Sequence, residues 1–312
     1  MSSLLTVICS VGMPTGERVD VVRRRFSGGP GPRVAIVAGV RGDTPEGIRV
    51  AHIVASHLQE HHDKINGTVD VYPCVNPLAA HRGMRRWPFF DQDLNRRFPG
   101  RAGAHAPDQV AFQLVEDLQG IDQLIEVRGA NTAFTEALQA QVRHTDQDAA
   151  ELARHGNVEV VWARVPGPAA PSTLVYQFAS SIVLEGGTGN RLTAGIAESL
   201  ANGVLNILNV KGMLPDEALP FHWAGVARPR IVTDDHVCRV RAEVGGLFLP
   251  MVRPWDEVEA SQLIGEVVDP IGGRVLEEIS SPLSGRVLAL REQPVVLPGT
   301  MVARIVGEGD NG

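Results

Sequence analysis

Lysine and cysteine are both scarce in this chain of 312 residues. Of its 29 basic residues only Lys64 and Lys211 are lysine, a bias that we attribute to a GC-rich genome favouring arginine codons. Cys9, Cys74 and Cys238 lie far apart, without the paired spacing of a zinc knuckle or a disulfide framework. Three isolated cysteines are typical of a protein from a reducing compartment.

Two further absences narrow the range of functions. The chain has no tract of clustered basic residues and carries a net charge of −7, which argues against a nucleic-acid partner. Its first residues lack a basic start followed by a long apolar region, so we expect no signal peptide, no membrane-spanning helix and no membrane partner. These features predict a cytoplasmic protein. The length allows one large domain and one small one.

The clearest positive feature is a continuous apolar run at residues 34–40, which leads through a glycine turn into a helical pattern over residues 46–58. An apolar run of this length predicts a buried central strand. In an open α/β sheet, ligands bind beside the carboxyl ends of the strands. We therefore expect the functional site of this protein at residues 41–44.

Residues 39–44 resemble the first metal-binding segment of the succinylglutamate desuccinylase and aspartoacylase family, zinc hydrolases with a carboxypeptidase fold. Members of that family carry Gly-x-His-Gly-(Asp/Asn)-Glu here, and the His and the Glu bind zinc. This chain reads Gly-Val-Arg-Gly-Asp-Thr, so Arg41 and Thr44 stand at the two ligand positions. The frame of the motif is retained, and both ligands are replaced.

Residues 76–100 strengthen the resemblance. Family members carry Asn-Pro-x-Ala, then an arginine, then Asp-Leu-Asn-Arg-x-Phe-Pro-Gly, and the last motif is complete at residues 93–100. The resemblance implies that Arg85, Asn95 and Arg96 hold the carboxylate end of a substrate. The planar fork of a guanidinium suits a carboxylate. The alternative is that the polar residues of this motif only hold the loop together.

Two later segments complete the comparison. A strand predicted over residues 121–127 ends in Glu-Val-Arg where the family ends in Asp-Leu-His, so Arg128 stands at the position of the third zinc ligand. Apolar residues precede Glu185 and glycines follow it, as around the glutamate that activates the zinc-bound water in the family. The resemblance therefore implies that Glu185 is the catalytic residue.

The three replacements predict that this chain has no zinc and no other cofactor. Guanidinium has no lone pair to donate, and a protein zinc site takes its ligands from His, Cys, Asp or Glu. Two like unit charges ~4 Å apart cost about 4 kcal/mol at an effective dielectric near 20, so Arg41 and Arg128 need an anion if both point inward. Glu185 is the obvious internal anion.

Histidines offer another source of metal ligands. His57 and His61 have the spacing of a His-x-x-Glu-His metalloprotease motif. The helix dipole also favours histidines in the last turn of a helix, and we prefer that interpretation. If the chain had a metal site with unrecognised ligands, those ligands would come from His57 and His61, from His81 or from His105.

The pattern as a whole predicts an α/β fold. We expect a doubly wound mixed sheet of carboxypeptidase type at residues 1–222, followed by a smaller all-β, barrel-sandwich-like domain at residues 223–312. Turns at residues 282–285 and 296–300 resemble those of biotinyl and lipoyl domains. The second domain contains no lysine, so it cannot be a lysine-modified carrier. We expect it to cap the site or to contact another subunit.

Three functions are compatible with these features. In the first, which we favour, a metal-free member of the family binds an anionic, carboxylate-bearing small molecule in an arginine-rich pocket, without hydrolysis or in support of an active partner, as a homo-oligomer or paired with an active homologue. In the second, an enzyme acts on an amide or an N-acyl amino acid by zinc-independent chemistry at Glu185. In the third, a metal-dependent amidohydrolase uses unrecognised ligands. The pocket residues are Arg41, Arg85, Asn95, Arg96 and Arg128.

Overall fold

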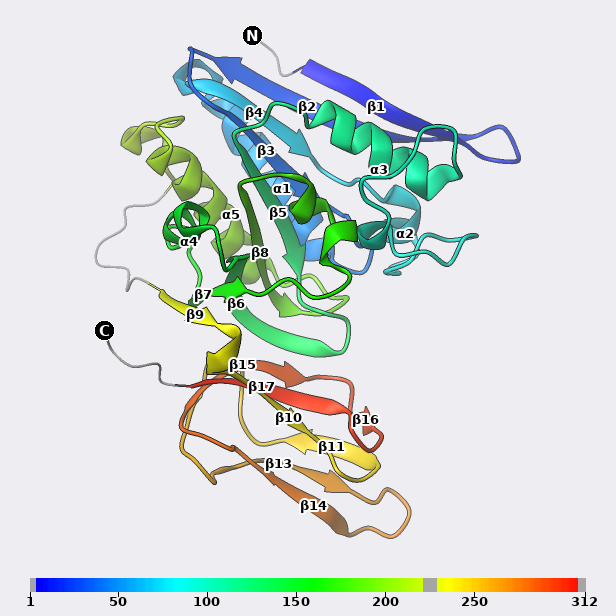
Figure 1. Ribbon diagram of the computed structural model, residues 1–312, viewed down its shortest axis with the longest axis vertical. Helices are drawn as coiled ribbons and strands as arrows, with labels where there is room; N and C mark the ends of the chain where they lie inside the picture. Colours follow the sequence, from blue (N-terminus) through cyan, green and yellow to red (C-terminus); the bar gives the residue numbers. More distant parts are fainter. Residues whose placement is uncertain (1–3, 221–228, 308–312) are drawn as a thin grey trace.

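The computed structural model describes residues 4–220 and 229–307. Within these residues a 13-stranded sheet has the order β1-β2-β4-β3-β5-β8-β6-β15-β17-β10, with β12 beside β15, β7 beside β6 and β9 beside β7 (Figure 1). Strands β4, β3, β5 and β8 are parallel neighbours, and β2 and β6 flank them in antiparallel orientation. The strands on the amino-terminal side are β1 (Leu4–Gly12), β2 (Arg18–Gly28), β3 (Arg33–Ala38), β4 (Gly67–Tyr72), β5 (Gln123–Gly129), β6 (Phe134–Arg143), β7 (Val160–Arg164), β8 (Ser181–Thr188) and β9 (Arg230–Thr233).

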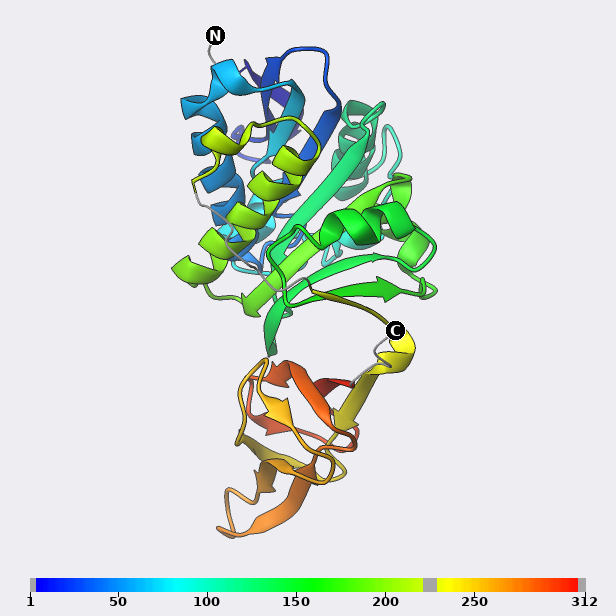
Figure 2. The same ribbon diagram turned by 90° about the vertical axis from the view of Figure 1, so that its left-hand side faces the viewer.

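Helices cover both faces of the parallel strands, as expected for a doubly wound sheet (Figures 1 and 2). On one face α1 and α5 pack against each other, with α4 beside them, over side chains such as Ile36 and Val127. On the other face α2 and α3 pack over Ala35 and Leu124. The helices are α1 (Pro45–Glu60), α2 (Pro77–His81), α3 (Ala106–Asp117), α4 (Gln147–Ala153) and α5 (Ala194–Val210).

The central strand forms because its side chains have an apolar neighbour on either face. Val34, Ile36 and Ala38 face α1, while Ala35 and Val37 face α3, and all five are fully buried. A parallel strand that is covered on both sides needs a continuous apolar run rather than an alternating one. The predicted strand at residues 34–40 and the predicted helix at residues 46–58 are thus confirmed, with bounds that differ by one or two residues.

The carboxyl-terminal part contains two packed sheets (Figure 1). Strands β10, β12, β15 and β17 extend the large sheet, because β15 pairs with β6. A separate four-stranded sheet, in the order β14-β13-β11-β16, packs on it around Phe248, Val267 and Ile305. These strands are β10 (Val237–Arg241), β11 (Gly246–Pro250), β12 (Glu257–Val258), β13 (Leu263–Val268), β14 (Val275–Ser280), β15 (Gly285–Arg291), β16 (Val295–Val296) and β17 (Met301–Gly307).

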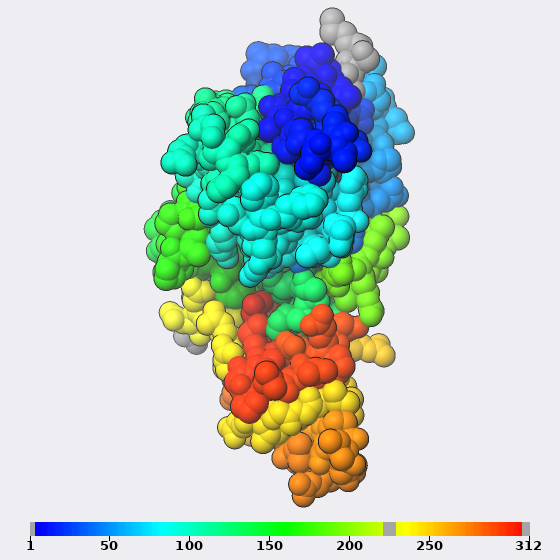
Figure 3. Space-filling model, turned by 90° about the vertical axis from the view of Figure 1, so that its right-hand side faces the viewer, coloured from blue at the N-terminus to red at the C-terminus, as the bar shows by residue number. Residues whose placement is uncertain are grey.

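The carboxyl-terminal strands form the narrower end of the molecule in the space-filling view (Figure 3). The all-β character predicted for this part is confirmed, and so is the overall α/β class. The domain boundary expected at residues 222 and 223 lies outside the described residues. Strand β9, at Arg230–Thr233, still pairs with β7 of the α/β part. No helix in the described ranges is long and apolar enough to cross a membrane.

Candidate functional site

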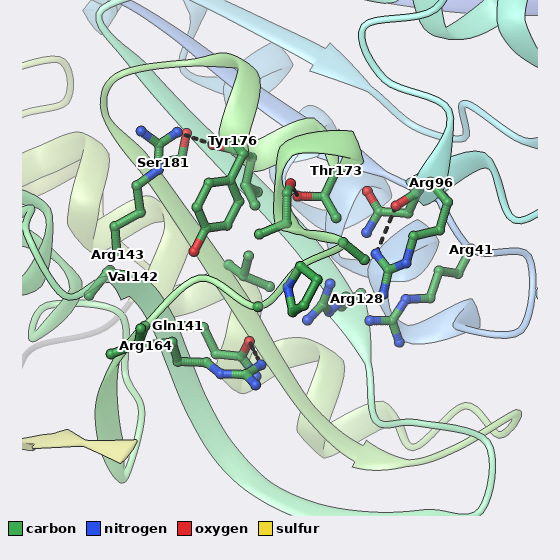
Figure 4. A pocket seen from close by; sticks show the side chains of 18 residues that line it. Arg41, Arg96, Arg128, Gln141, Val142, Arg143, Arg164, Thr173, Tyr176 and Ser181 are labelled. Carbon is green, nitrogen blue, oxygen red and sulfur yellow. Dashed lines mark hydrogen bonds between the residues drawn. The ribbon is translucent and has the colours of Figure 1, made fainter. Parts of the chain in front are cut away.

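A cavity of about 290 Å³ extends from the carboxyl ends of β3 and β5 to the first residues of β8 (Figure 4). The side chains that line it come from distant parts of the chain, and the charged ones are all arginine. They belong to the turn after β3, to the short helix η2 (Leu94–Arg96) and to strands β5, β6 and β7. The charged lining residues are Arg41, Arg96, Arg128, Arg143 and Arg164.

The turn after β3 places Arg41 at the cavity because two glycines allow a tight path. Gly39 has a φ of +64°, which glycine adopts without strain. A Cβ atom on Gly42 would lie 2.1 Å from the backbone carbon of Ala79 in α2, so a side chain there would displace that helix. These contacts explain why the turn needs glycine at both positions.

Arg128 and Glu185 face each other across the pair β5 and β8. The Arg128 Nε atom donates to Glu185 Oε2 at 2.5 Å, and Gln141 Nε2 donates to the other carboxylate oxygen. Both members of the ion pair are buried. Burial alone would raise the pKa of Glu185, but the charges of Arg128 and Arg41 hold it below its ordinary value. The expected pairing of Glu185 with a buried arginine is therefore confirmed, and Glu185 stays a carboxylate at neutral pH.

Arg41 is the second buried cation of the site, only 6% exposed. Its Nη1 atom donates to Asn131 Oδ1 at 3.0 Å, and Asn131 Nδ2 donates to Glu136 Oε1 at the same distance. Arg304 of β17 also reaches Glu136, at 3.4 Å. Burial, together with the neighbouring charges of Arg128 and Arg85, lowers the pKa of Arg41 to about 10, so it remains a cation at neutral pH.

The residues at the three family ligand positions do not fit a zinc ion. Thr44 is fully buried, and its hydroxyl donates to the backbone oxygen of Arg41 at 3.0 Å, which closes the turn before α1. Arg41 and Arg128 are cations without a lone pair. In the part of the chain that the structure describes, no group of three or more His, Cys, Asp or Glu side chains could hold a metal ion.

Only some residues of the loop that carries the complete family motif line the cavity. Asn95 and Arg96 line it, whereas Arg85 is not among its lining residues. Asp93 holds the loop together, because its carboxylate accepts from the Asn95 amide at 3.0 Å and from Arg85 Nε at 2.8 Å. The Asn95 side-chain oxygen accepts from the backbone amide of Leu174 at 3.1 Å. The loop-holding interpretation thus applies to Asp93 and partly to Asn95, while Arg96 is directed to the cavity.

Glu185 is not among the lining residues either. It lies in the middle of β8 and is held by Arg128 and Gln141, both of which do line the cavity. The carboxylate that the resemblance marks as catalytic is therefore covered by its own partners.

Arg143, Arg164 and Tyr176 were not singled out from the sequence, yet all three line the cavity. Arg143 and Arg164 end strands β6 and β7, and Tyr176 lies in the short helix η4 (Leu174–Gln177). The sequence pattern predicted no strand or helix at β1, β6, β9 or α4. In β6, Glu136, Ala137 and Ala140 are of types depleted in strands, so the local signal for this strand is weak.

Three of the histidines that could have supplied other ligands, His57, His61 and His105, make contacts of their own. His57 Nε2 lies 2.6 Å from the backbone oxygen of Ala218, and its ring stacks on that of His61. His105 is bonded to Asp108 at 2.9 Å. These contacts favour the interpretation of the histidine-rich helix as an ordinary helix end.

Comparison with known proteins gives a consistent result. Residues 30–210, more than half of the chain, match the family model described as the succinylglutamate desuccinylase/aspartoacylase catalytic domain. A curated relative, N-alpha-acetyl-L-2,4-diaminobutyric acid deacetylase from Halomonas elongata, is 25% identical in an alignment of length 268 that covers 80% of this chain and 73% of the relative.

Solved structures share the fold at low identity. The product-bound ectoine utilization protein EutE (DoeB) from Ruegeria pomeroyi superposes with a TM-score of 0.84 at 18% identity, over 99% of this chain and 96% of that one. The succinylglutamate desuccinylase/aspartoacylase structure from Rhodobacter sphaeroides gives a TM-score of 0.84 at 19% identity, over 99% and 97% of the two chains. The carboxypeptidase-type fold predicted from the sequence is thereby confirmed.

Proposed function

Since this chain belongs to the succinylglutamate desuccinylase/aspartoacylase family, we propose that it binds a carboxylate-bearing small molecule in the arginine-lined cavity. Membership of that family supports a function of the deacylase type. We further propose that the chain binds this molecule without zinc and without hydrolysis. The observation that carries the proposal is the buried pair of Arg128 and Glu185, which joins a former ligand position to the carboxylate that the resemblance marks as catalytic.

The arginines supply the positive charge that a carboxylate ligand needs. The structure places no acidic side chain among the residues lining this cavity, and arginine offers paired donors that match the two oxygens of a carboxylate. Arg96 and Arg41 are the best placed to receive it, because neither has a carboxylate within 4 Å among the described residues. Arg128 is already neutralised by Glu185 and Glu126.

The similarity to the Halomonas elongata relative agrees with this ligand class. The name of that protein describes removal of an acetyl group from an acetylated amino acid, a molecule that bears a carboxylate. An N-acyl amino acid is therefore the natural first ligand to test. Hydrolysis would require an activated water, and Glu185 is held by Arg128 and Gln141 rather than exposed to the cavity.

Two measurements test the proposal. Protein purified without a tag or chelator is exposed to zinc and desalted, and its metal content is measured by mass spectrometry. We expect less than about a tenth of an equivalent, because the three ligand positions carry no suitable donors. Calorimetry with N-acetyl amino acids should then show binding that Arg96→Gln weakens about tenfold, the value of one charge-assisted hydrogen bond.

Arg274 in the exposed turn before β14 supplies the control, since its side chain is 75% exposed and does not line the cavity. Arg274→Gln should bind the same acids as the unmodified protein does. Close to one equivalent of zinc, or equal binding by the Arg96 and Arg274 variants, would contradict the proposal.

A further inference from the structure

We propose that Arg304 of β17, which does not line the cavity, sets the orientation of Arg41, which does. It acts through two side chains that lie between them, Glu136 and Asn131, and we call these three residues other than Arg41 the relay. Arg304 is thus a positioning residue supplied by the carboxyl-terminal part of the chain. This inference rests on the proposed function, since it concerns the affinity of the arginine-lined cavity for its ligand.

Arg304 reaches Glu136 across three strands of the large sheet. Ala289 of β15 is the register partner of both residues, so the three form a row across β6, β15 and β17. Directly opposed residues of an antiparallel pair point to the same face of a sheet. Two strand spacings amount to about 10 Å, and the small side chain of Ala289 leaves room for the long arginine to pass over β15. The Arg304 Nη1 atom lies 3.4 Å from Glu136 Oε1.

Glu136 depends on Arg304 for its negative charge. The side chain of Glu136 is fully buried, and in residues 4–220 and 229–307 Arg304 is the only cation within 4 Å of its carboxylate. Burial, and after it the neighbouring charge of Glu185, raises the pKa of Glu136. Arg304 has the largest opposing effect on that pKa. Removal of the Arg304 charge therefore favours the protonated form of the Glu136 carboxyl group.

The orientation of the Asn131 amide is determined by its two charged partners. Arg41 Nη1 donates to Asn131 Oδ1, and Asn131 Nδ2 donates to Glu136 Oε1, both at 3.0 Å. A guanidinium can only donate and a carboxylate can only accept, so this is the one orientation that satisfies both. A protonated Glu136 is able to donate. The amide is then free to turn its NH2 group toward Arg41, which has no acceptor for it.

Arg41 has few other contacts that would hold it in place. Within the described ranges Asn131 is the only side chain that accepts a hydrogen bond from Arg41, and the Arg41 Nε atom is buried without a partner. Its guanidinium lies at the cavity near that of Arg128, whose like charge repels it (Figure 4). Loss of the Asn131 oxygen therefore lets Arg41 turn away from the position in which it receives a carboxylate.

The loop that carries Asn131 is fixed against the turn that carries Arg41. The hydroxyl of Thr132 donates to the carboxylate of Asp43 in that turn. The backbone oxygen of Asn131 accepts from the amide of Phe134 at 2.8 Å. Because the backbone is held from both sides, a change at the carboxylate of the relay alters the direction of the Asn131 amide rather than the path of the loop.

The side-chain signal of Arg41 tests the relay without any ligand. The Nε–H signal of Arg41 in a proton–nitrogen correlation spectrum of the full chain is assigned by its absence from Arg41→Gln. Arg304→Gln should shift this signal, because the Asn131 oxygen no longer faces the guanidinium. Arg304→Lys keeps a positive charge beside Glu136 and should leave the signal close to its original position.

Arg286 of β15 supplies the matched control. It is also paired with a glutamate, at 3.0 Å from Glu257, and its guanidinium also lies over an aromatic ring, that of Trp255. It has no contact with Glu136 among the described residues and does not line the cavity. Arg286→Gln should therefore change neither the Arg41 signal nor ligand binding.

Calorimetry with N-acetylglycine measures the effect of the relay on the cavity. We expect Arg304→Gln and Asn131→Ala each to weaken binding about fivefold to tenfold, and Arg304→Lys to bind within about twofold of the unmodified protein. The double variant of Arg304→Gln and Asn131→Ala should bind no more weakly than Asn131→Ala alone, because Arg304 acts through Asn131. A general structural role of Arg304 would instead give losses that add.

The outcomes separate the two proposals. An unchanged Arg41 signal in Arg304→Gln, or losses that add in the double variant, would overturn the relay and leave the proposed function standing. Failure of the unmodified protein to bind any N-acetyl amino acid would overturn the proposed function, and the Arg41 signal would still decide whether the relay exists. The thermal transition of each variant verifies that it is folded. If Arg304→Gln does not fold, an unshifted Arg41 signal in Asn131→Ala overturns the relay.

Discussion

The guanidinium of Arg128 and the carboxylate of Glu185 form a buried ion pair, 2.5 Å between Nε and Oε2, across two neighbouring parallel strands. In the family resemblance these positions belong to a zinc ligand and to the glutamate that activates water. Here the two side chains neutralise each other instead. The pair has a second partner in Glu126, whose carboxylate lies 3.2 Å from Arg128 Nη1.

Breaking this pair should destabilise the protein strongly. Glu185→Gln leaves Arg128 buried beside a neutral amide, and removal of one member of a buried ion pair costs about 3 to 5 kcal/mol. Because Glu126 still contacts Arg128, we expect the lower end of that range. Urea denaturation followed by circular dichroism measures the change in the free energy of unfolding.

The exposed pair of Glu151 and Arg154, three residues apart and 3.4 Å between charged atoms, provides the control. Glu151→Gln should cost less than about 0.5 kcal/mol, because water screens the charges of an exposed pair. Equal costs for the two substitutions would show that Glu185 is not the counter-charge of the site.

Restoring the family ligands should create a zinc site. The triple variant Arg41→His, Thr44→Glu, Arg128→His puts three donors at positions that meet at the carboxyl ends of β3 and β5, and it removes two cations that repel a metal ion. We expect about one equivalent of zinc by mass spectrometry. The matched control is the triple variant Arg41→Gln, Thr44→Gln, Arg128→Gln. It also lacks the two arginine charges, but it has no strong metal ligand and no negative charge at residue 44. Equal zinc uptake by the two folded variants would disprove the assignment of these positions.

Glu46 should make stability depend on pH. It is fully buried at the start of α1, and neither of its carboxylate oxygens has a hydrogen-bond partner within the described part of the chain. Burial raises its pKa from 4.5 to about 7, against a smaller opposing effect of nearby backbone amides. The folded protein thus keeps a proton that the unfolded chain releases, so the free energy of unfolding should fall as the pH rises from 4.5 to 7.

The size of this effect is on the order of 2 kcal/mol, and Glu46→Gln should remove it because an amide does not titrate. Denaturation curves recorded across that pH range measure the slope. Glu116→Gln, on the exposed side of α3, should leave the slope unchanged. An identical slope in the Glu46 variant would mean that another group is responsible.

Two glycines of α5 should respond oppositely to alanine. A Cβ atom on Gly203 would lie 1.9 Å from the backbone oxygen of Gly156, so Gly203→Ala should force α5 away from its neighbour and cost about 2 kcal/mol. A Cβ atom on Gly195 has nothing within 4 Å, and Gly195→Ala should be neutral or stabilising by up to about 1 kcal/mol. Chemical denaturation of both variants tests the packing of this helix, and equal effects would contradict it.

The sequence alone determined the features that short motifs encode. The apolar run of β3, the glycine frame around Arg41 and the complete motif at residues 93–100 predicted the fold class and the location of the cavity. They also identified Arg96 and Arg128 as cavity residues, since a motif fixes the local path of the chain and therefore the direction of its side chains.

Only the tertiary structure decided which side chains meet. Arg143 and Arg164 reach the cavity because β6 and β7 pair with each other and β6 pairs with β8, in register set by contacts between residues far apart in sequence. Glu136 likewise joins Asn131 to Arg304, 168 residues away from Glu136. No local propensity predicts such pairings, because a strand rich in alanine and glutamine forms only when its neighbours supply the hydrogen bonds and the packing.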